Sequence, residues 1–427
     1  MTEYHCTTLA NGLRVAIAHM PYWQSVSIGV FAGSGSRHEA ARRNGIAHFT
    51  EHLLFKGTAK RSAKRIVVDA ESVGGSINAY TSEEHTCYHI KSPAGTMNKM
   101  MALLADIYQN SQFRPKEINR ERRVIEDEIL MYRDQPATYV DDLLSSLTWK
   151  GNPLGKPILG SPKTLARLNQ EDFFAYVERA YGGRNTVVAI AGPQPINKML
   201  TVVEKHFGSL HRGTRLPSKL FRPAKRQTKP ALISESRPIE QTQMTIGFRT
   251  NGRHDPDASV TNLLSVLMGE TMSSRLSQEL REKRGYCYQV GTQRDLYRDV
   301  GLFNIYAGFD PRYLQKTLEV IRRECQRLKD QPPTQRELNR AFQHEAGQHM
   351  MGMEETGAQM FWIGDCLISD DDDFHPDIYL EALRGVTPTH IQRVANDLFK
   401  PNKTSIALLG PEVEPSRPMV ADILAEL

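Results

Sequence analysis

The stretch His48-Phe49-Thr50-Glu51-His52 places two imidazoles and a carboxylate where they could share one metal ion. It lies in a run from Gly45 to Gly57 that has apolar residues at helical positions and no proline, which predicts a helix. An α-helix has 3.6 residues per turn, so the two histidines lie only about 40° apart around the axis, and Glu51 projects beside them. Zinc favours imidazole and carboxylate ligands of this kind.

A catalytic zinc needs three protein ligands and one position for water, so the motif requires a third ligand from elsewhere. In a chain with 14 histidines such a pentapeptide arises by chance at a rate on the order of a few per cent. The predicted helix 116–133 is rich in acidic residues, namely Glu117, Glu121, Glu126, Asp127 and Glu128. Glu121 and Glu128 are two turns apart and point the same way. These carboxylates could equally pair with arginines at helical spacing, and composition does not choose among them.

The composition describes an ordinary globular protein of two or three domains. The chain has 427 residues, of which 40% are hydrophobic and 24% charged. A net charge of +5 is too small for this length to indicate nucleic-acid binding. The five cysteines are scattered and odd in number, which predicts reduced thiols in a cytoplasmic protein. Neither a signal peptide nor a membrane span is expected.

The elements around the motif follow from periodicity and turn signals. Asn11-Gly12 predicts a hairpin, and a loop at 33–40 leads into the metal helix. Strands are expected at 25–32, within 76–92 and at 186–191, and helices at 62–73, 97–111, 116–133, 139–149 and 196–207.

The second half of the sequence repeats features of the first. Residues 186–193 (TVVAIAGP) are echoed by 404–411 (TSIALLGP), and Ile28-Gly29 by Ile246-Gly247, both at a displacement of 218. Arg37-His38-Glu39 is echoed by Arg253-His254-Asp255, two residues out of step with that displacement. A constant displacement at distant places predicts a duplicated domain. Where the second copy would carry its metal helix, residues 262–270 contain no histidine. The expected division is a metal-binding domain at 1–208, an extended basic linker at 209–230 and a homologous domain without metal at 231–427.

The chain resembles the pitrilysin and mitochondrial processing peptidase family of zinc peptidases. H-x-x-E-H is the inverzincin signature. The segment Glu121 to Glu128 matches the family pattern E-R-x-V-I-x-x-E, with Glu128 76 positions after His52. The resemblance implies one Zn²⁺ per chain on His48, His52 and Glu128, with Glu51 as general base. Glu121 is implied near the metal as a catalytic or supporting carboxylate. The implied fold is α+β, with two homologous domains, each a largely antiparallel sheet with helices packed on one face.

Two further segments match the family. In Ser76 to Thr81, the match implies an edge strand on which Asn78 and Ala79 contact an extended peptide. An ordinary strand is the alternative. Arg281 and Tyr288 match an Arg and Tyr pair that binds the substrate carbonyl or stabilises the oxyanion. A helix end with a solvated arginine is the alternative there.

The resemblance also implies a partner chain. Longer relatives enclose a chamber with four domains and this chain has two, so a homodimer is expected, with each chain's Arg and Tyr completing the other's site; a heterodimer is the alternative. Residues 268–275 hold a single glycine, unlike the glycine-rich loop of the mitochondrial enzyme's non-catalytic subunit. The leading function is a zinc endopeptidase acting on short or unfolded peptides. The alternatives are a dedicated leader or presequence processing peptidase and a non-catalytic structural subunit.

Overall fold

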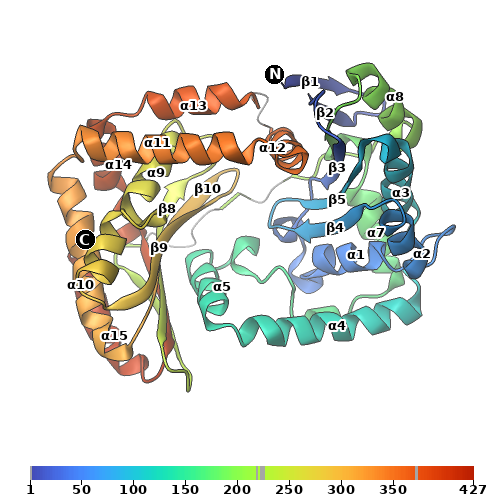
Figure 1. The fold of residues 1–427 in the computed structure, drawn as a ribbon. Helices are drawn as coiled ribbons and strands as arrows, with labels where there is room; N and C mark the ends of the chain where they lie inside the picture. Colours follow the sequence, from blue (N-terminus) through green and yellow to red (C-terminus); the bar gives the residue numbers. More distant parts are fainter. Residues whose placement is uncertain (1, 218–219, 222–226, 371–373) are drawn as a thin grey trace. The chain divides into compact units, whose positions relative to one another are not determined.

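The chain forms two compact units, each assembled from three separate segments (Figure 1). The computed structural model describes residues 2–217, 220–221, 227–370 and 374–427. Unit 1 contains Met1–Leu130, Lys156–Lys219 and Met350–His375. Unit 2 contains Met131–Gly155, Leu220–His349 and Pro376–Leu427.

Unit 1 is built on a mixed, mainly antiparallel sheet. Its strands are β1 (Glu3–Thr8), β2 (Arg14–His19), β3 (Ser25–Ala32), β4 (Ser76–Thr81), β5 (Thr86–Pro93) and β6 (Thr186–Gly192). Their order is β1-β2-β6-β3-β5-β4, in which β2 and β6 are parallel and the other neighbours antiparallel. The predicted hairpin is confirmed, because β1 pairs with β2 and Gly12 adopts φ +85° in the turn. Strand β4 lies at one edge of this sheet.

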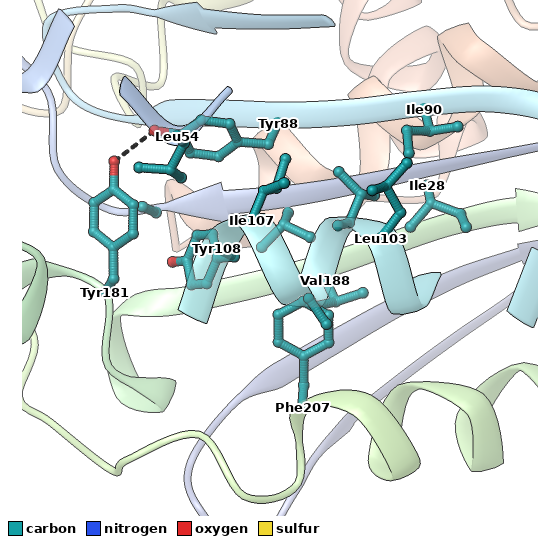
Figure 2. Close-up of a cluster of buried hydrophobic side chains, with 14 of the residues drawn as sticks. Ile28, Leu54, Tyr88, Ile90, Leu103, Ile107, Tyr108, Tyr181, Val188 and Phe207 are labelled. Atoms are coloured by element: carbon teal, nitrogen blue, oxygen red, sulfur yellow. Dashed lines mark hydrogen bonds between the residues drawn. The ribbon is translucent and has the colours of Figure 1, made fainter. Parts of the chain in front are cut away.

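One face of this sheet carries most of the helices of unit 1. These are α1 (Ile46–Leu54), α2 (Ala63–Glu71), α3 (Met97–Asn110), α4 (Pro115–Arg133), α6 (Pro162–Leu165), α7 (Gln170–Ala180) and α8 (Ile196–Phe207). Figure 2 shows α3 pressing Leu103 and Ile107 onto strand residues Ile28 and Ile90 in the core. A hydrogen bond of 2.8 Å joins the hydroxyls of Tyr88 and Tyr181, so these two buried polar groups in the core satisfy each other.

The opposite face of the unit 1 sheet is covered by a helix from the far end of the chain. Helix α12 (Thr356–Ile368) packs on β2, β3 and β6 through Met360, Ile363 and Leu367. A Cβ on Gly29 would lie 2.3 Å from the sulfur of Met360, so glycine leaves room for the Met360 side chain of α12 in its observed position. The hydroxyls of Thr356 and Ser27, 3.0 Å apart, fix the start of α12 on β3.

Unit 2 repeats this design. Its strands are β7 (Ala231–Ser236), β8 (Thr242–Asn251), β9 (Cys287–Leu296), β10 (Val300–Phe309) and β11 (Thr404–Gly410), in the order β7-β11-β8-β10-β9. The parallel pair β7–β11 corresponds to β2–β6, and the three strands beyond it follow the same antiparallel pattern. Its helices are α9 (Ala258–Ser265), α10 (Leu314–Asp330), α11 (Gln335–Gly352), α13 (Pro376–Arg384), α14 (Pro388–Leu398) and α15 (Arg417–Ala425).

The second sheet is covered in turn by a helix from the first half of the chain. Helix α5 (Pro136–Thr148) packs Val140 and Leu144 against Ala407 and Leu409 of β11. The two halves therefore exchange one helix each. The division expected at 1–208 and 231–427 follows the order of the sheets in the sequence, whereas the compact units assign α5 and α12 to the sheet that each helix covers. Within the expected linker 209–230, residues 218–219 and 222–226 lie outside the described residues.

Among the residues that the structure describes, no helix combines the length and the apolar character needed to cross a bilayer.

Candidate metal centre

Helix α1 presents both motif histidines on one face, as its spacing predicts. The rings of His48 and His52 have centroids 4.6 Å apart. Helix α4 brings Glu128 against them, with Oε2 at 3.7 Å from Nε2 of His48 and 3.6 Å from Nε2 of His52. One possible ligand atom from each residue lies within 4.8 Å of the other two. The structure therefore assembles a His-His-Glu cluster from residues far apart in the sequence.

The polar atoms of this cluster fit a bound cation. Oε2 of Glu128 is buried and has no hydrogen-bond partner among the described residues. A buried carboxylate oxygen left in this way costs free energy unless a positive charge faces it. Burial, and next the charge of His52, lower the pKa of His48 to about 3, so its imidazole is neutral, which is the metal-binding form. Burial also raises the pKa of Glu128, and the nearby His52 opposes that rise. Two imidazole nitrogens and one carboxylate oxygen form the three-ligand set of a catalytic zinc.

Glu51 lies on the same helix and is held by a residue that sequence reasoning missed. The hydroxyl of Thr81, the last residue of β4, donates a 2.6 Å hydrogen bond to Oε2 of Glu51. Burial raises the pKa of Glu51, while the Thr81 hydrogen bond and His52 lower it and Glu128 raises it. A raised pKa and a fixed carboxylate suit a general base. The alternation along β4 puts Thr81 on the same face as Ala79, but nothing in the sequence says that this face meets α1.

Glu121 supports the cluster from α4. Its side chain is only 2% exposed, and its Oε2 lies 3.4 Å from Nδ1 of His52. Its Oε1 pairs with Nζ of Lys56 at 2.9 Å. Glu121 thus touches the ring nitrogen of His52 that does not face Glu128, and fixes the orientation of that imidazole. Of the two roles that the sequence leaves open, this contact favours support over direct catalysis. Lys56, which sequence reasoning also missed, balances the charge of Glu121.

The edge strand β4 borders a hollow beside the cluster. The hollow measures about 480 Å³, and its lining includes Glu51, His52, Phe55, Lys56, Ile77 and Asn78. Asn78 is exposed, while Ala79 turns toward the core of unit 1. An edge strand offers unpaired backbone groups to an extended chain. Asn78 therefore lines the hollow, and Ala79 is the next residue of the same edge strand.

The predicted Arg and Tyr pair comes together in unit 2. The guanidinium carbon of Arg281 lies 5.5 Å from the centre of the Tyr288 ring, a cation–π distance. Tyr288, on β9, is 80% exposed. Nε of Arg281 also lies 3.7 Å from Oε1 of Glu282. The pair is thus open to solvent and available for a ligand.

Two homologous α+β domains, one with a His-His-Glu cluster beside a fixed glutamate, define a zinc-protease class of architecture. Residues 14–162 match the family described as insulinase (peptidase family M16), and residues 167–343 match the peptidase M16 inactive domain. The chain belongs to peptidase family M16. This confirms the resemblance to the pitrilysin family, and the inactive-domain match agrees with the absence of histidine from residues 262–270.

Similar proteins from several bacteria carry the name zinc protease. An uncharacterized zinc protease of Rickettsia bellii is 34% identical over 96% of this chain and 98% of its own. The zinc protease YmxG of Bacillus subtilis is 33% identical over 95% of this chain and 97% of its own. Among solved structures, a protease from Helicobacter pylori has a TM-score of 0.88 at 24% identity, covering 96% of this chain and 100% of that one. The peptidase M16 inactive domain from Pseudomonas fluorescens has a TM-score of 0.89 at 19% identity, covering 96% and 99%. These two structures confirm the predicted α+β fold.

Proposed function

We propose that this chain is a zinc-dependent endopeptidase that hydrolyses short or unfolded peptides in a chamber formed by two chains. The observation that carries the proposal is the convergence of His48, His52 and Glu128 beside Glu51, with Oε2 of Glu128 unsatisfied among the described residues. A scaffold subunit would have no need for a buried carboxylate oxygen without a hydrogen-bond partner next to two imidazoles.

The residues of the site divide the work of peptide hydrolysis. His48, His52 and Glu128, whose possible ligand atoms lie within 4.8 Å of one another, would hold the zinc ion. When bound, zinc polarises the scissile carbonyl and acidifies its water ligand. Glu51 takes a proton from the attacking water and passes it to the leaving amine. The Thr81 hydroxyl holds the Glu51 carboxylate in place through its hydrogen bond to Oε2.

Substrate binding is assigned to the edge of β4 and to the second domain. An extended peptide adds to β4 beside Asn78 and Ala79 and places one side chain in the adjoining hollow. Arg281 and Tyr288 of a second copy bind the carbonyl of the bond to be cut. We therefore propose a homodimer with two sites. A cytoplasmic location is part of the proposal and rests on the odd number and scatter of the cysteines.

The proposal is tested on purified full-length chain. Metal analysis is expected to find one zinc per chain, a chelator is expected to abolish cleavage of an unfolded peptide library, and zinc to restore it. Solution mass is expected to equal two chains. A zinc-free chain with full peptidase activity, or a zinc-loaded chain that cleaves no peptide, would overturn it. Cleavage of many peptides supports the broad endopeptidase, and cleavage confined to one leader sequence identifies a dedicated processing enzyme.

A further inference from the structure

Glu39 is a buried carboxylate in unit 1 that the proposed mechanism does not use. It follows a short 3₁₀ turn at Ser36–His38 and is only 8% exposed. Its Oε2 accepts hydrogen bonds from the backbone N–H of Gly45 at 2.8 Å and from Nδ2 of Asn44 at 2.9 Å. Its Oε1 accepts from the backbone N–H of Ala47 at 2.8 Å. Both oxygens thus bind the start of α1.

The start of α1 needs such an acceptor because its own cap residue has none. The N-cap is Gly45, and no side chain from that position bonds the first turn. The first N–H groups of a helix lack partners within the helix, and a negative charge at that end is favourable.

A residue with its own capping side chain is excluded at this position by geometry. Gly45 has φ +96°, and a Cβ on it would lie 2.7 Å from the carbonyl oxygen of Leu159. The acceptor is therefore supplied from six residues upstream.

We propose that Glu39 is a positioning residue for the metal centre. Ala47, which donates to Glu39, directly precedes His48, so the carboxylate fixes the turn that carries the first ligand. A helix that starts in a different place or direction would carry both imidazoles away from Glu128, which sits on another element. The inference rests on the proposed function, since it concerns the binding of zinc by the same cluster.

The surroundings of Glu39 support a specific role for its charge. Burial raises its pKa to about 7, while the hydrogen bonds from Ala47, Asn44 and Gly45 and the charge of Lys156 oppose that rise. Keeping an ionised carboxylate in such a place costs free energy. The cost is offset only where the charge has partners, and the partners here are two backbone donors at the start of α1, Gly45 and Ala47, and the side-chain amide of Asn44.

The second domain offers a matched control. Asp255, the counterpart of Glu39 in the repeated Arg-His-acid segment, accepts from the backbone N–H of Asp257 at 2.8 Å, ahead of α9. Asp255→Asn should therefore disturb the start of a helix that carries no metal ligand.

The experiment measures zinc affinity by chelator competition and the visible spectrum of the Co²⁺-substituted full chain. Glu39→Gln is expected to lower zinc affinity by about 10- to 100-fold and to change the Co²⁺ spectrum. Asp255→Asn is expected to change neither. Wild-type zinc affinity and spectrum in Glu39→Gln would overturn the inference, whereas a wild-type chain that binds no zinc would overturn the proposed function itself.

A second variant covers the case in which Glu39→Gln does not fold, as judged by circular dichroism of the metal-free chain. Asn44→Ala removes one of the three donors to Glu39 and leaves the two backbone donors in place. It is expected to weaken zinc binding less than Glu39→Gln does, in the same direction. Unchanged zinc affinity in a folded Asn44→Ala chain would then contradict the positioning role.

Discussion

The helix pair α1 and α4 of unit 1 and the helix pair α9 and α11 of unit 2 have equivalent positions in the chain order of their domains. Each pair, with the side chains that it holds, is called a corner below. In unit 1, α1 follows β3 and α4 follows α3; in unit 2, α9 follows β8 and α11 follows α10. The first corner holds two imidazoles and a carboxylate with an unsatisfied oxygen. The second holds Asn262, whose Nδ2 donates to Oε1 of Glu345 at 3.2 Å and to the hydroxyl of Tyr379 at 2.5 Å.

The two sites differ in the hydrogen-bond partners of their buried polar side chains. In unit 2 the hydroxyl of Tyr379 also donates to Oε1 of Glu345, so amide, phenol and carboxylate bond one another. In unit 1 the Nε2 atoms of His48 and His52 lie 3.7 and 3.6 Å from Oε2 of Glu128, and that oxygen has no hydrogen-bond partner among the described residues. The duplicated scaffold thus holds a ligand site whose imidazole nitrogens and carboxylate oxygen do not hydrogen-bond one another, and a structural site in which an amide nitrogen, a phenol and a carboxylate do. Oδ1 of Asn262 is the atom of that structural site left without a partner among the described residues.

The largest expected effect comes from removing a ligand on the metal side of this comparison. His52→Ala should lose zinc and lower peptidase activity by at least about 10³-fold, because the metal supplies several kcal/mol of transition-state stabilisation. Asn262→Ala in unit 2 should keep zinc and activity while lowering the free energy of unfolding by about 1–3 kcal/mol. Metal analysis, peptide cleavage and denaturant unfolding check both variants. Zinc loss in Asn262→Ala would break the comparison.

Glu51→Gln should separate chemistry from metal binding. The amide cannot accept the proton of the attacking water, so kcat should decrease by about 10²- to 10⁴-fold. Zinc content should remain that of the wild type, since Glu51 is not in the ligand cluster. Metal analysis beside single-turnover cleavage tests this, and substantial retained turnover would remove Glu51 from the role of base.

Thr81→Val should have an intermediate effect confined to catalysis. The Thr81 hydroxyl lowers the pKa of Glu51 by donating to its carboxylate, so removing it should raise that pKa. Activity that requires ionised Glu51 should then begin at higher pH, with kcat near neutrality lowered about tenfold. A pH–rate profile of the two proteins measures the shift. An acid limb that moves to lower pH would contradict the assigned hydrogen bond.

The smallest expected effect concerns stability without metal. The pKa of Glu39 is raised by burial from 4.5 to about 7, so between these pH values the folded state holds a proton that the unfolded state has lost. The contribution of Glu39 to the free energy of unfolding therefore decreases as the pH rises through that window. The melting temperature of metal-free wild type should decrease relative to that of Glu39→Gln from pH 5 to pH 8. Parallel melting curves across this range would contradict the raised pKa.

Much of the site follows from local patterns, and the remainder depends on contacts between distant elements. The spacing of His48 and His52 already places them on one face of α1, and turn and period signals locate the strands. Only the family resemblance distinguishes Glu128, because several carboxylates on α4 have equivalent local patterns. The supporting contacts of Lys56 and Thr81 join separate elements, and no periodicity encodes such meetings.

The helix exchange escaped prediction for a related reason. The apolar face of α5 or α12 shows that the helix is buried, but it does not show which sheet buries it. Both sheets offer similar apolar strands, since they arose from one repeat, so the destination of each helix depends on the complete fold.

The exchange of α5 and α12 also has a consequence for synthesis on the ribosome. The last strand of the first sheet, β6, emerges well before residues 356–368, so one apolar face of that sheet stays exposed while most of unit 2 is translated. A nascent chain in this state exposes hydrophobic surface that can aggregate with other chains. Chaperone capture of the growing polypeptide should therefore end only when α12 has left the exit tunnel.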